Sequence, residues 1–491
     1  MKKRFLALCL VLLFVFSSLV LFAEDAPAKG FKITNNTVLN VGISIVPEYD
    51  SNISRASEDS VTTKKETSTN EDGSKVETTT QDPSAVVYDM ILHYSPSLRI
   101  KLDDSNKTVG FSAVLDYNHY LGAEKKKTSK KSFLEVRSDF LGEFNKSGLV
   151  IFDFKNTLSR SATPDEELSG KHETLLDSFA IGLAFKNVED ILYGKIKLGF
   201  DINYLEESKK SSDFKDNNYA SFVADFFGRW KFLPKTMAFM SASVRYQDYY
   251  ESSFRDEARA IPVNAFVGVM GQVSPHFSAK LAAGYSVNAG KSVQHDYNAN
   301  AEIVFKYNNT GASLGYLRTM NPSASYKYKS THKLYFIFKQ KFAQKFLAAV
   351  NLNYSHISFG KNISYDNKKN DNGEKEWTKL DNGSYQKSKQ GVETGSDGSE
   401  YSSTNLITLV LPSGKRKDHL VTFSPSLSYG ILPWLGLKLS YTLEYKGTDY
   451  SQTKTTTYTT DNPSKKSYVK EEIKHYDYID LRAMLAIVLD Y

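Results

Sequence analysis

Cysteine is nearly absent from this chain, and long apolar runs are absent once the N-terminal segment is set aside. The single cysteine, Cys9, lies within that segment. The remaining chain therefore has no residue for disulfides, thiolate metal sites or a cysteine nucleophile. No later run approaches the roughly 20 apolar residues that a membrane-spanning helix needs. Basic residues only slightly outnumber acidic ones, so the composition gives no indication of a nucleic-acid partner.

The N-terminal segment has the organisation of a secretory signal peptide. Three basic residues precede an apolar run over residues 5–21, and Ala23 supplies a small residue before Glu24. This order predicts a signal peptide over residues 1–23, with a membrane anchor as the alternative. Removing its three basic residues lowers the formal charge from +6 to +3. Residues 24–37 are then a short polar segment, which we expect on the periplasmic side.

Apolar and polar residues alternate along most of the mature chain. Between residues 195 and 204, for example, Leu198, Phe200 and Ile202 share one parity, whereas Lys195 and Lys197 share the other. Because successive side chains of a strand point to opposite faces, this rhythm predicts strands with one apolar and one polar face. The pattern gives eighteen such segments, with sixteen as the lower count: residues 39–49, 90–102, 109–117, 134–143, 150–154, 179–185, 195–204, 222–232, 238–246, 263–273, 277–287, 297–307, 312–318, 334–342, 346–354, 421–429, 437–445 and 479–491.

The links between these segments alternate in length. From the second strand onward, every other link is short, and the links between them are long and rich in Lys, Ser, Asn and Gly. Short periplasmic turns and long extracellular loops produce this asymmetry in membrane barrels, whereas soluble sandwiches and propellers have no reason for it. The sequence therefore predicts an all-β fold, a transmembrane up-and-down antiparallel β-barrel, over residues 38–491 as a single domain. Long polar links include residues 54–84, 124–131, 159–173, 206–217 and 361–417, of which 361–417 is the longest.

Two short motifs agree with this fold. Leu485, Ile487, Leu489 and Tyr491 resemble the C-terminal sorting signal of outer-membrane β-barrels, in which apolar residues alternate before a terminal aromatic ring. The stretch 46–53, with Tyr-Asp-Ser-Asn at its centre, resembles the opening strand of porin-type barrels. The resemblance implies a location in the bacterial cell outer membrane, surrounded by its lipid, and recognition by the barrel-assembly machinery.

The polar parity of the strands is expected to face the lumen, because a barrel of this size is too wide for side chains to fill. Charges of both signs occur there with a basic excess, which favours a mild preference for anions; paired charges on a wet wall are the alternative. Residues 159–173 and 361–417 could fold into the lumen or remain exposed loops. The predicted pore-lining residues are Arg99, Lys101, Asp116, Arg137, Asp139, Lys195, Lys197, Asp201, Asp225, Arg229, Arg245, Lys280 and Arg482.

One stretch carries the residue types of a lipid hydrolase. Residues 354–360, Tyr-Ser-His-Ile-Ser-Phe-Gly, resemble the Tyr-Thr-His-x-Ser-Asn-Gly stretch of outer-membrane phospholipase A. The resemblance implies that His356 is the base and Ser358 the nucleophile, but Phe359 occupies the position of the asparagine. A calcium-like stretch at residues 370–373 has Lys368 and Lys379 at flanking ligand positions, and both cations would repel the ion. We expect no metal site and no cofactor.

These observations favour a channel for passive diffusion of small hydrophilic solutes that is not an enzyme. Two alternatives remain at this stage. One is a surface adhesin or structural barrel with binding loops, and the other is a phospholipase that uses His356 and Ser358. The sequence leaves the solute, the pore diameter and the oligomeric state open, a homo-oligomer included.

Overall fold

The computed structural model describes the chain from residue 30 to residue 490. The expected signal peptide and Tyr491, the last residue of the expected sorting signal, lie outside the described residues. So do residues 24–29 and some internal segments, which are 53–60, 70–74, 84–87, 123–131, 165–170, 188, 206–216, 253–254, 291–292, 324–325, 344, 361–376, 382–383, 395–398, 412–414 and 461–466.

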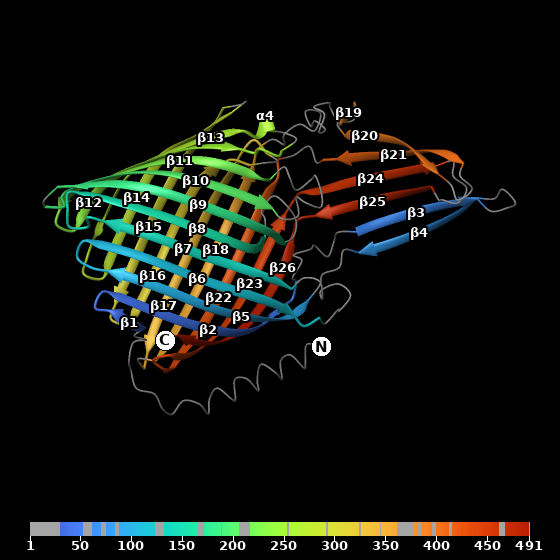
Figure 1. The fold of residues 1–491 in the computed structure, drawn as a ribbon. Coiled ribbons are helices and arrows are strands. Elements are labelled where there is room, and N and C mark those ends of the chain that lie inside the picture. The colour runs from blue at the N-terminus through green and yellow to red at the C-terminus, as the bar shows by residue number, and fades with distance from the viewer. Residues whose placement is uncertain are drawn as a thin grey trace.

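Eighteen antiparallel strands close into a barrel, as the alternation predicts (Figure 1). Each strand pairs with its neighbours in chain order, and the last pairs with the first. The strands are β2 (Thr37–Asp50), β5 (Asp89–Asp103), β6 (Lys107–Tyr120), β7 (Phe133–Phe144), β8 (Val150–Pro164), β9 (Lys171–Lys186), β10 (Leu192–Leu205), β11 (Tyr219–Leu233), β12 (Thr236–Asp248), β13 (Ala260–Gln272), β14 (Phe277–Gly290), β15 (Gln294–Tyr307), β16 (Thr310–Asn321), β17 (Lys329–Phe342), β18 (Phe346–Phe359), β22 (Lys417–Leu432), β23 (Leu435–Thr448) and β26 (Tyr478–Asp490). A short strand, β1 (Phe31–Thr34), flanks the start of β2.

The seam between β2 and β26 joins the two motifs found in the sequence. Ile43 lies opposite Leu489 and Ile45 opposite Ile487, so the apolar parities of the two strands match. At the other end of the seam, the backbone N–H of Ser51 donates to the carbonyl of Leu481 at 2.9 Å. The side-chain amide of Asn52 donates to the carbonyl of Ile479 at 3.2 Å. The Tyr-Asp-Ser-Asn stretch therefore fastens one end of the closing seam.

The strands differ sharply in how they are linked at the two ends of the barrel. At one end the links are short, such as residues 234–235 between β11 and β12 and residues 308–309 between β15 and β16. At the other end most links are longer, although β14 and β15 are joined by residues 291–293 alone, and one small helix, α4 (Arg255–Ala258), lies in the link after β12. The predicted link at residues 159–173 is too wide, because β8 continues to Pro164 and β9 begins at Lys171. The described residues of this segment therefore lie in barrel strands, so the alternative in which they fold into the lumen does not hold for them.

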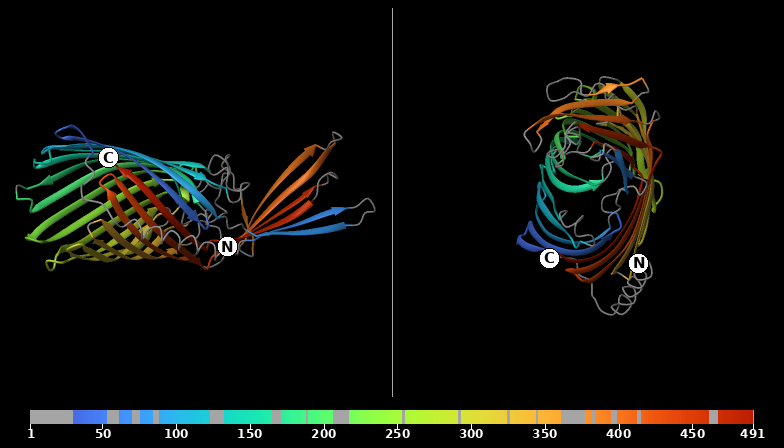
Figure 2. Two further views of the ribbon diagram at one scale, coloured as in Figure 1. Left: turned by 90° about the horizontal axis from the view of Figure 1, so that it is seen from below. Right: turned by 90° about the vertical axis from the view of Figure 1, so that its right-hand side faces the viewer.

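Three of the long links carry a second sheet, which the sequence analysis treated as loops. Seven antiparallel strands lie in the order β19-β20-β21-β24-β25-β3-β4 and extend beyond the barrel (Figures 1 and 2). The link at 54–84 supplies one hairpin and that at 361–417 another, so the described part of residues 361–417 extends away from the lumen. The strands are β3 (Val61–Thr69), β4 (Lys75–Pro83), β19 (Thr378–Lys379), β20 (Tyr385–Thr394), β21 (Glu400–Val410), β24 (Ser451–Thr460) and β25 (Ser467–His475).

The apolar face of the barrel strands is exposed, and no layer formed by the described residues covers it. Leu198, for example, is 53% exposed. Exposed aromatic residues gather near both ends of this face, and the band between them is mainly aliphatic with a few aromatic residues such as Phe226 and Phe336. Girdles of this kind are the pattern of a barrel that spans a membrane. The girdle near the long links contains Tyr94, Tyr117, Tyr246, Tyr285, Tyr297, Tyr354 and Tyr445, and the girdle near the short links contains Phe152, Phe185, Trp230, Phe232, Phe277, Tyr307, Phe342 and Trp434.

The chain therefore forms a transmembrane β-barrel of the bacterial outer-membrane type, as the alternation predicts. Within the described part of the chain, none of the helical segments combines the length and apolar character needed to cross a bilayer.

Candidate functional site: the polar inner wall

The polar parity of the strands lies on the concave side of the barrel. Ion pairs there join strands that are not neighbours, which is feasible only where side chains converge. Lys195 of β10 reaches Asp153 of β8 at 2.8 Å, across β9. Gly182 of β9 makes room for this pair, because a Cβ atom at Gly182 would lie 2.5 Å from the Asp153 carboxylate. Arg245 of β12 lies 3.5 Å from Asp201 of β10 in the same manner.

Most of the predicted pore-lining residues are joined in local networks on this face. Asp116 accepts a hydrogen bond from Ser95 at 2.8 Å and lies 3.1 Å from His93. Arg482 lies between Glu444 and Asp480, at 3.3 and 3.2 Å. The remaining contacts are Lys101 with Asp103 at 2.7 Å, Arg137 with Asp139 at 3.0 Å, and Asp225 with Ser243 at 2.7 Å. The inner wall is thus largely charge-paired.

A few basic side chains on the same parity have no ion-pair partner among the described residues. Arg99 and Lys197 are two of the predicted pore-lining residues in this position, and Lys306 and Lys438 are similar. Lys280 contacts an aromatic ring instead, with its ammonium 5.4 Å from the ring centre of Phe239. Acidic side chains on the same parity, among them Glu143, Asp225 and Glu302, likewise have no ion-pair partner among the described residues, so the unpaired charges of the wall are of both signs.

The short-link end of the wall combines cations with aromatic rings. Arg229 and Lys231 both contact Asp190 in the turn before β10, at 2.7 and 2.6 Å. The Lys231 ammonium, together with the Arg229 guanidinium, holds the pKa of the Asp190 carboxyl below its usual range. The Arg229 guanidinium also lies 4.8 Å from the ring centre of Tyr193. One carboxylate therefore neutralises part of the charge of two basic residues.

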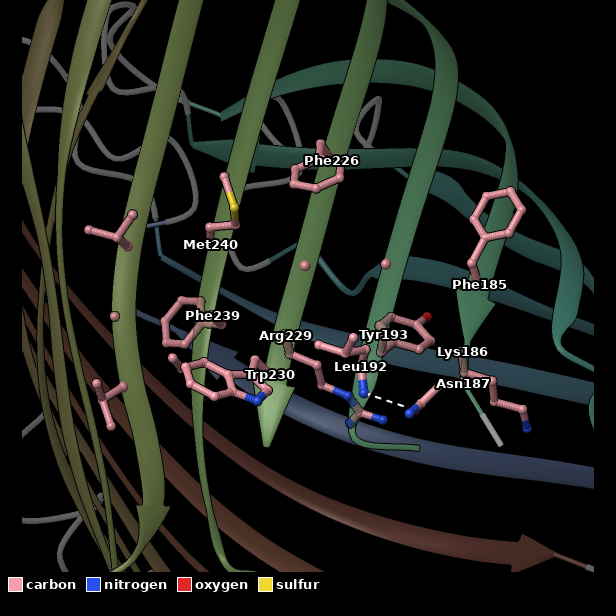
Figure 3. A pocket seen from close by; sticks show the side chains of 16 residues that line it. Phe185, Lys186, Asn187, Leu192, Tyr193, Phe226, Arg229, Trp230, Phe239 and Met240 are labelled. Carbon is pink, nitrogen blue, oxygen red and sulfur yellow. Dashed lines mark hydrogen bonds between the residues drawn. The ribbon is translucent and has the colours of Figure 1, made fainter. Parts of the chain in front are cut away.

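A hollow of about 850 Å³ lies on the outer side of the same strands (Figure 3). Gly194 and Gly228 are opposite each other in the register, and because neither has a side chain, the backbone is exposed at the bottom of the hollow. Phe226, Trp230 and Met240 surround the hollow. Because this face is apolar and lies at an aromatic girdle, the hollow suits a lipid tail and not a hydrophilic solute.

The long-link end holds a buried cluster that the sequence analysis missed. The Arg416 guanidinium is fully buried and pairs with Asp418 at 2.6 Å. It also lies 4.6 Å from the ring centres of both Phe359 and Tyr476. Burial raises the pKa of Tyr476 to about 12, so this phenol is neutral at physiological pH. Arg416 lies in a polar link without alternation, and the sequence contains no signal for this cluster.

The structure places His356 beside Ser358, as the phospholipase resemblance requires. The Ser358 hydroxyl lies 3.1 Å from Nε2 of His356. However, Nδ1 of His356 is buried and has no hydrogen-bond partner among the described residues. Phe359, at the position of the family's asparagine, lies on the opposite parity and contacts Arg416. Within the described segments, the pair therefore has no third residue to orient the histidine as a base.

No group of three or more metal-ligating side chains within the described segments is arranged to hold a metal ion.

Comparisons with models of protein families and with curated proteins find no match. Among solved structures, Pseudomonas aeruginosa OccK3 (OpdO) has a TM-score of 0.40 at 9% identity, covering 92% of this chain and 96% of that chain. Pseudomonas aeruginosa OpdK has a TM-score of 0.39 at 9% identity, covering 92% and 99%. The FrpB iron transporter from Neisseria meningitidis, in its apoprotein form, has a TM-score of 0.39 at 9% identity, covering 88% and 81%. Similarity this distant carries no argument about function.

Proposed function

We propose that the protein is an outer-membrane channel for passive diffusion of small hydrophilic solutes. The observation that carries the proposal is a closed barrel of eighteen strands with a polar, charged inner face. Barrels of roughly this strand number leave a water-filled channel, because side chains cannot fill their interior. The thirteen predicted pore-lining residues contribute to its wall. Residues 38–491 act as one barrel unit, residues 1–23 as its signal peptide, and Ile487 and Tyr491 as part of its assembly signal. The mechanism requires no cofactor and no turnover.

The channel has a mild preference for anions under this proposal. Its support is the excess of basic over acidic residues among the predicted pore-lining residues, which include Arg99, Lys197 and Lys280. Charged rings tune the selectivity of wide pores through the local potential, so unpaired cations favour anions. Paired residues such as Asp139 with Arg137 contribute little net field.

A liposome-swelling assay tests the diffusion function. Proteoliposomes are placed in isotonic solutions of sugars of increasing size, and the rate of swelling is measured. We expect rapid swelling in small sugars and a falling rate as the solute grows, because the wall imposes only a size limit. Protein-free liposomes serve as the control. Swelling no faster than that control would refute the diffusion proposal.

The seven-stranded outer sheet favours surface binding as a second candidate function. Its strands are rich in Thr and Ser. At its base, Trp377, Tyr385 and Leu409 form a buried hydrophobic cluster. A barrel that serves only to display this sheet would be closed, and it would give no swelling. The same assay therefore separates the two functions.

The spacing of His356 and Ser358 favours hydrolysis of membrane lipid as a further alternative. Under the channel proposal, the purified protein releases no fatty acid from phospholipid, and Ser358→Ala leaves solute diffusion unchanged. Fatty-acid release that is lost in Ser358→Ala would establish a hydrolase instead.

A further inference from the structure

Three histidines form a continuous row on the outer face of the barrel. His332 of β17 lies directly opposite His356 of β18, and His356 lies directly opposite His419 of β22. Their ring centres are 6.1 and 4.7 Å apart, respectively. All three lie near the long-link end of their strands, on the same parity as exposed Leu334 and Leu352. The row therefore faces the membrane and not the lumen.

The row lies just beyond the aromatic girdle. Tyr316 places its hydroxyl 2.8 Å from Nδ1 of His332, and Tyr354 places its hydroxyl 2.8 Å from Nδ1 of His419. His356 is two residues beyond Tyr354 on the same face of β18. With a rise of about 3.3 Å per residue on a tilted strand, the row lies roughly 5 Å outside the girdle, at the level of the lipid headgroups.

Basic side chains flank the row at the same level. Arg318 of β16 is opposite His332 in the register, and exposed Lys417 of β22 is opposite Ser358. Arg318 also pairs with Asp296 at 2.6 Å. Asp418, the neighbouring acid on β22, lies on the other parity and pairs with buried Arg416. The described groups on the outer face at this level are thus mainly cationic or imidazole.

We propose that the row of His332, His356 and His419, together with Lys417, binds the phosphate of an anionic lipid headgroup in the outer leaflet. Imidazole N–H groups and an ammonium donate charge-assisted hydrogen bonds to phosphate oxygens, which are the stronger class of hydrogen bond. The acyl chains of such a lipid lie over the aliphatic band below the girdle, where Leu334 and Leu352 are exposed. This inference is independent of whether the barrel conducts.

The site depends on pH because imidazole changes its charge near neutrality. A histidine ring that gains a proton acquires a positive charge and a second N–H donor. The charged groups that face the row are Arg318, Lys417 and Asp296, and the phenols that face it are those of Tyr316 and Tyr354. Phosphate binding therefore strengthens on acidification and weakens as the rings lose their protons.

Native mass spectrometry of the detergent-purified full chain with added phosphatidic acid tests the site, with phosphatidylcholine as the reference lipid. We expect the double variant His356→Gln/His419→Gln to bind phosphatidic acid about tenfold more weakly than wild type at about pH 6, since two charge-assisted donors are lost. Wild-type binding should fall by a similar factor at about pH 8. Phosphatidylcholine binding should not change.

His295→Gln is the matched control, because His295 pairs with Tyr285 at 2.8 Å on the same face but lies outside the row. It should bind phosphatidic acid as wild type does. The heat-dependent gel shift of folded barrels verifies that each variant folds. If the double variant does not fold, Lys417→Gln is measured in its place. Equal phosphatidic acid binding by the row variant and wild type would overturn the proposal, as would binding independent of pH. Uptake of Zn²⁺ by the row without a preference for phosphatidic acid would also overturn it.

Discussion

Asp190 controls the charge at the short-link end of the inner wall. Among the described residues, its carboxylate forms ion pairs with both Arg229 and Lys231. The pKa of Asp190 is lowered, so the pair persists above the ordinary carboxyl pKa and is lost only as the pH falls through the lowered value. At neutral pH two cations are therefore partly neutralised by one acid.

Asp190→Asn should raise the ratio of anion to cation permeability. The substitution removes the counter-charge and leaves both basic side chains in place. Reversal potentials across a bilayer in a salt gradient measure the ratio. Lys231→Gln is the opposed control and should lower the ratio. A ratio that moves in the same direction in both variants would contradict this role of the turn.

Arg416 should stabilise the long-link end of the barrel. Arg416→Met leaves Lys446, at 3.4 Å, as the one remaining described cation beside the fully buried carboxylate of Asp418. Breaking a buried pair in this way costs about 3 kcal/mol of unfolding free energy. Urea unfolding in detergent measures the loss. The paired replacement Arg416→Met/Asp418→Leu should recover much of it, and a double variant as unstable as the single one would contradict the assignment.

The two parities of a strand should respond differently to charge. Leu198 and Lys197 are neighbours near the middle of β10 but face opposite sides of the wall. Leu198→Arg places a charge against lipid and should cost about 2–4 kcal/mol, whereas Lys197→Gln should change stability little. Unfolding in lipid vesicles measures both. Equal effects from the two variants would mean that the faces are assigned wrongly.

The strand pattern was predictable where one face is apolar. Each of the eighteen expected segments overlaps a barrel strand, because the two-residue rhythm records which face meets lipid. The outer sheet was missed because strands such as β24, with the sequence SQTKTTTYTT, are polar on both faces. Its threonines favour strands, yet this propensity gives no alternation to detect.

The alternation indicates which face of the barrel each site residue occupies, but it does not indicate which side chains contact one another. The alternation places Lys195 and Asp153 on the same face of the barrel wall. Their contact could not be predicted, because it depends on the relative stagger of β8, β9 and β10 and on the absence of a side chain at Gly182. The Arg416 cluster depends on several links that meet in space and are distant in sequence. No local pattern encodes such a meeting point.

The whole molecule consists of a barrel and an outer sheet built from its long links. Tyr385 and Leu409 are directly opposite at the base of the β20–β21 hairpin. Replacing residues 386–408 with a short Gly-Ser turn should therefore remove the hairpin and leave the barrel folded. Solute-dependent swelling should persist in this variant. A variant that folds but no longer conducts would show that the sheet is part of the channel.

Single-channel recording in planar bilayers tests the central claim, a closed membrane barrel around a water-filled lumen, most directly. The account predicts steady conductance steps from the purified, refolded protein, with anions more permeant than cations. A correctly folded barrel that inserts into the bilayer and gives no steady conductance would contradict it.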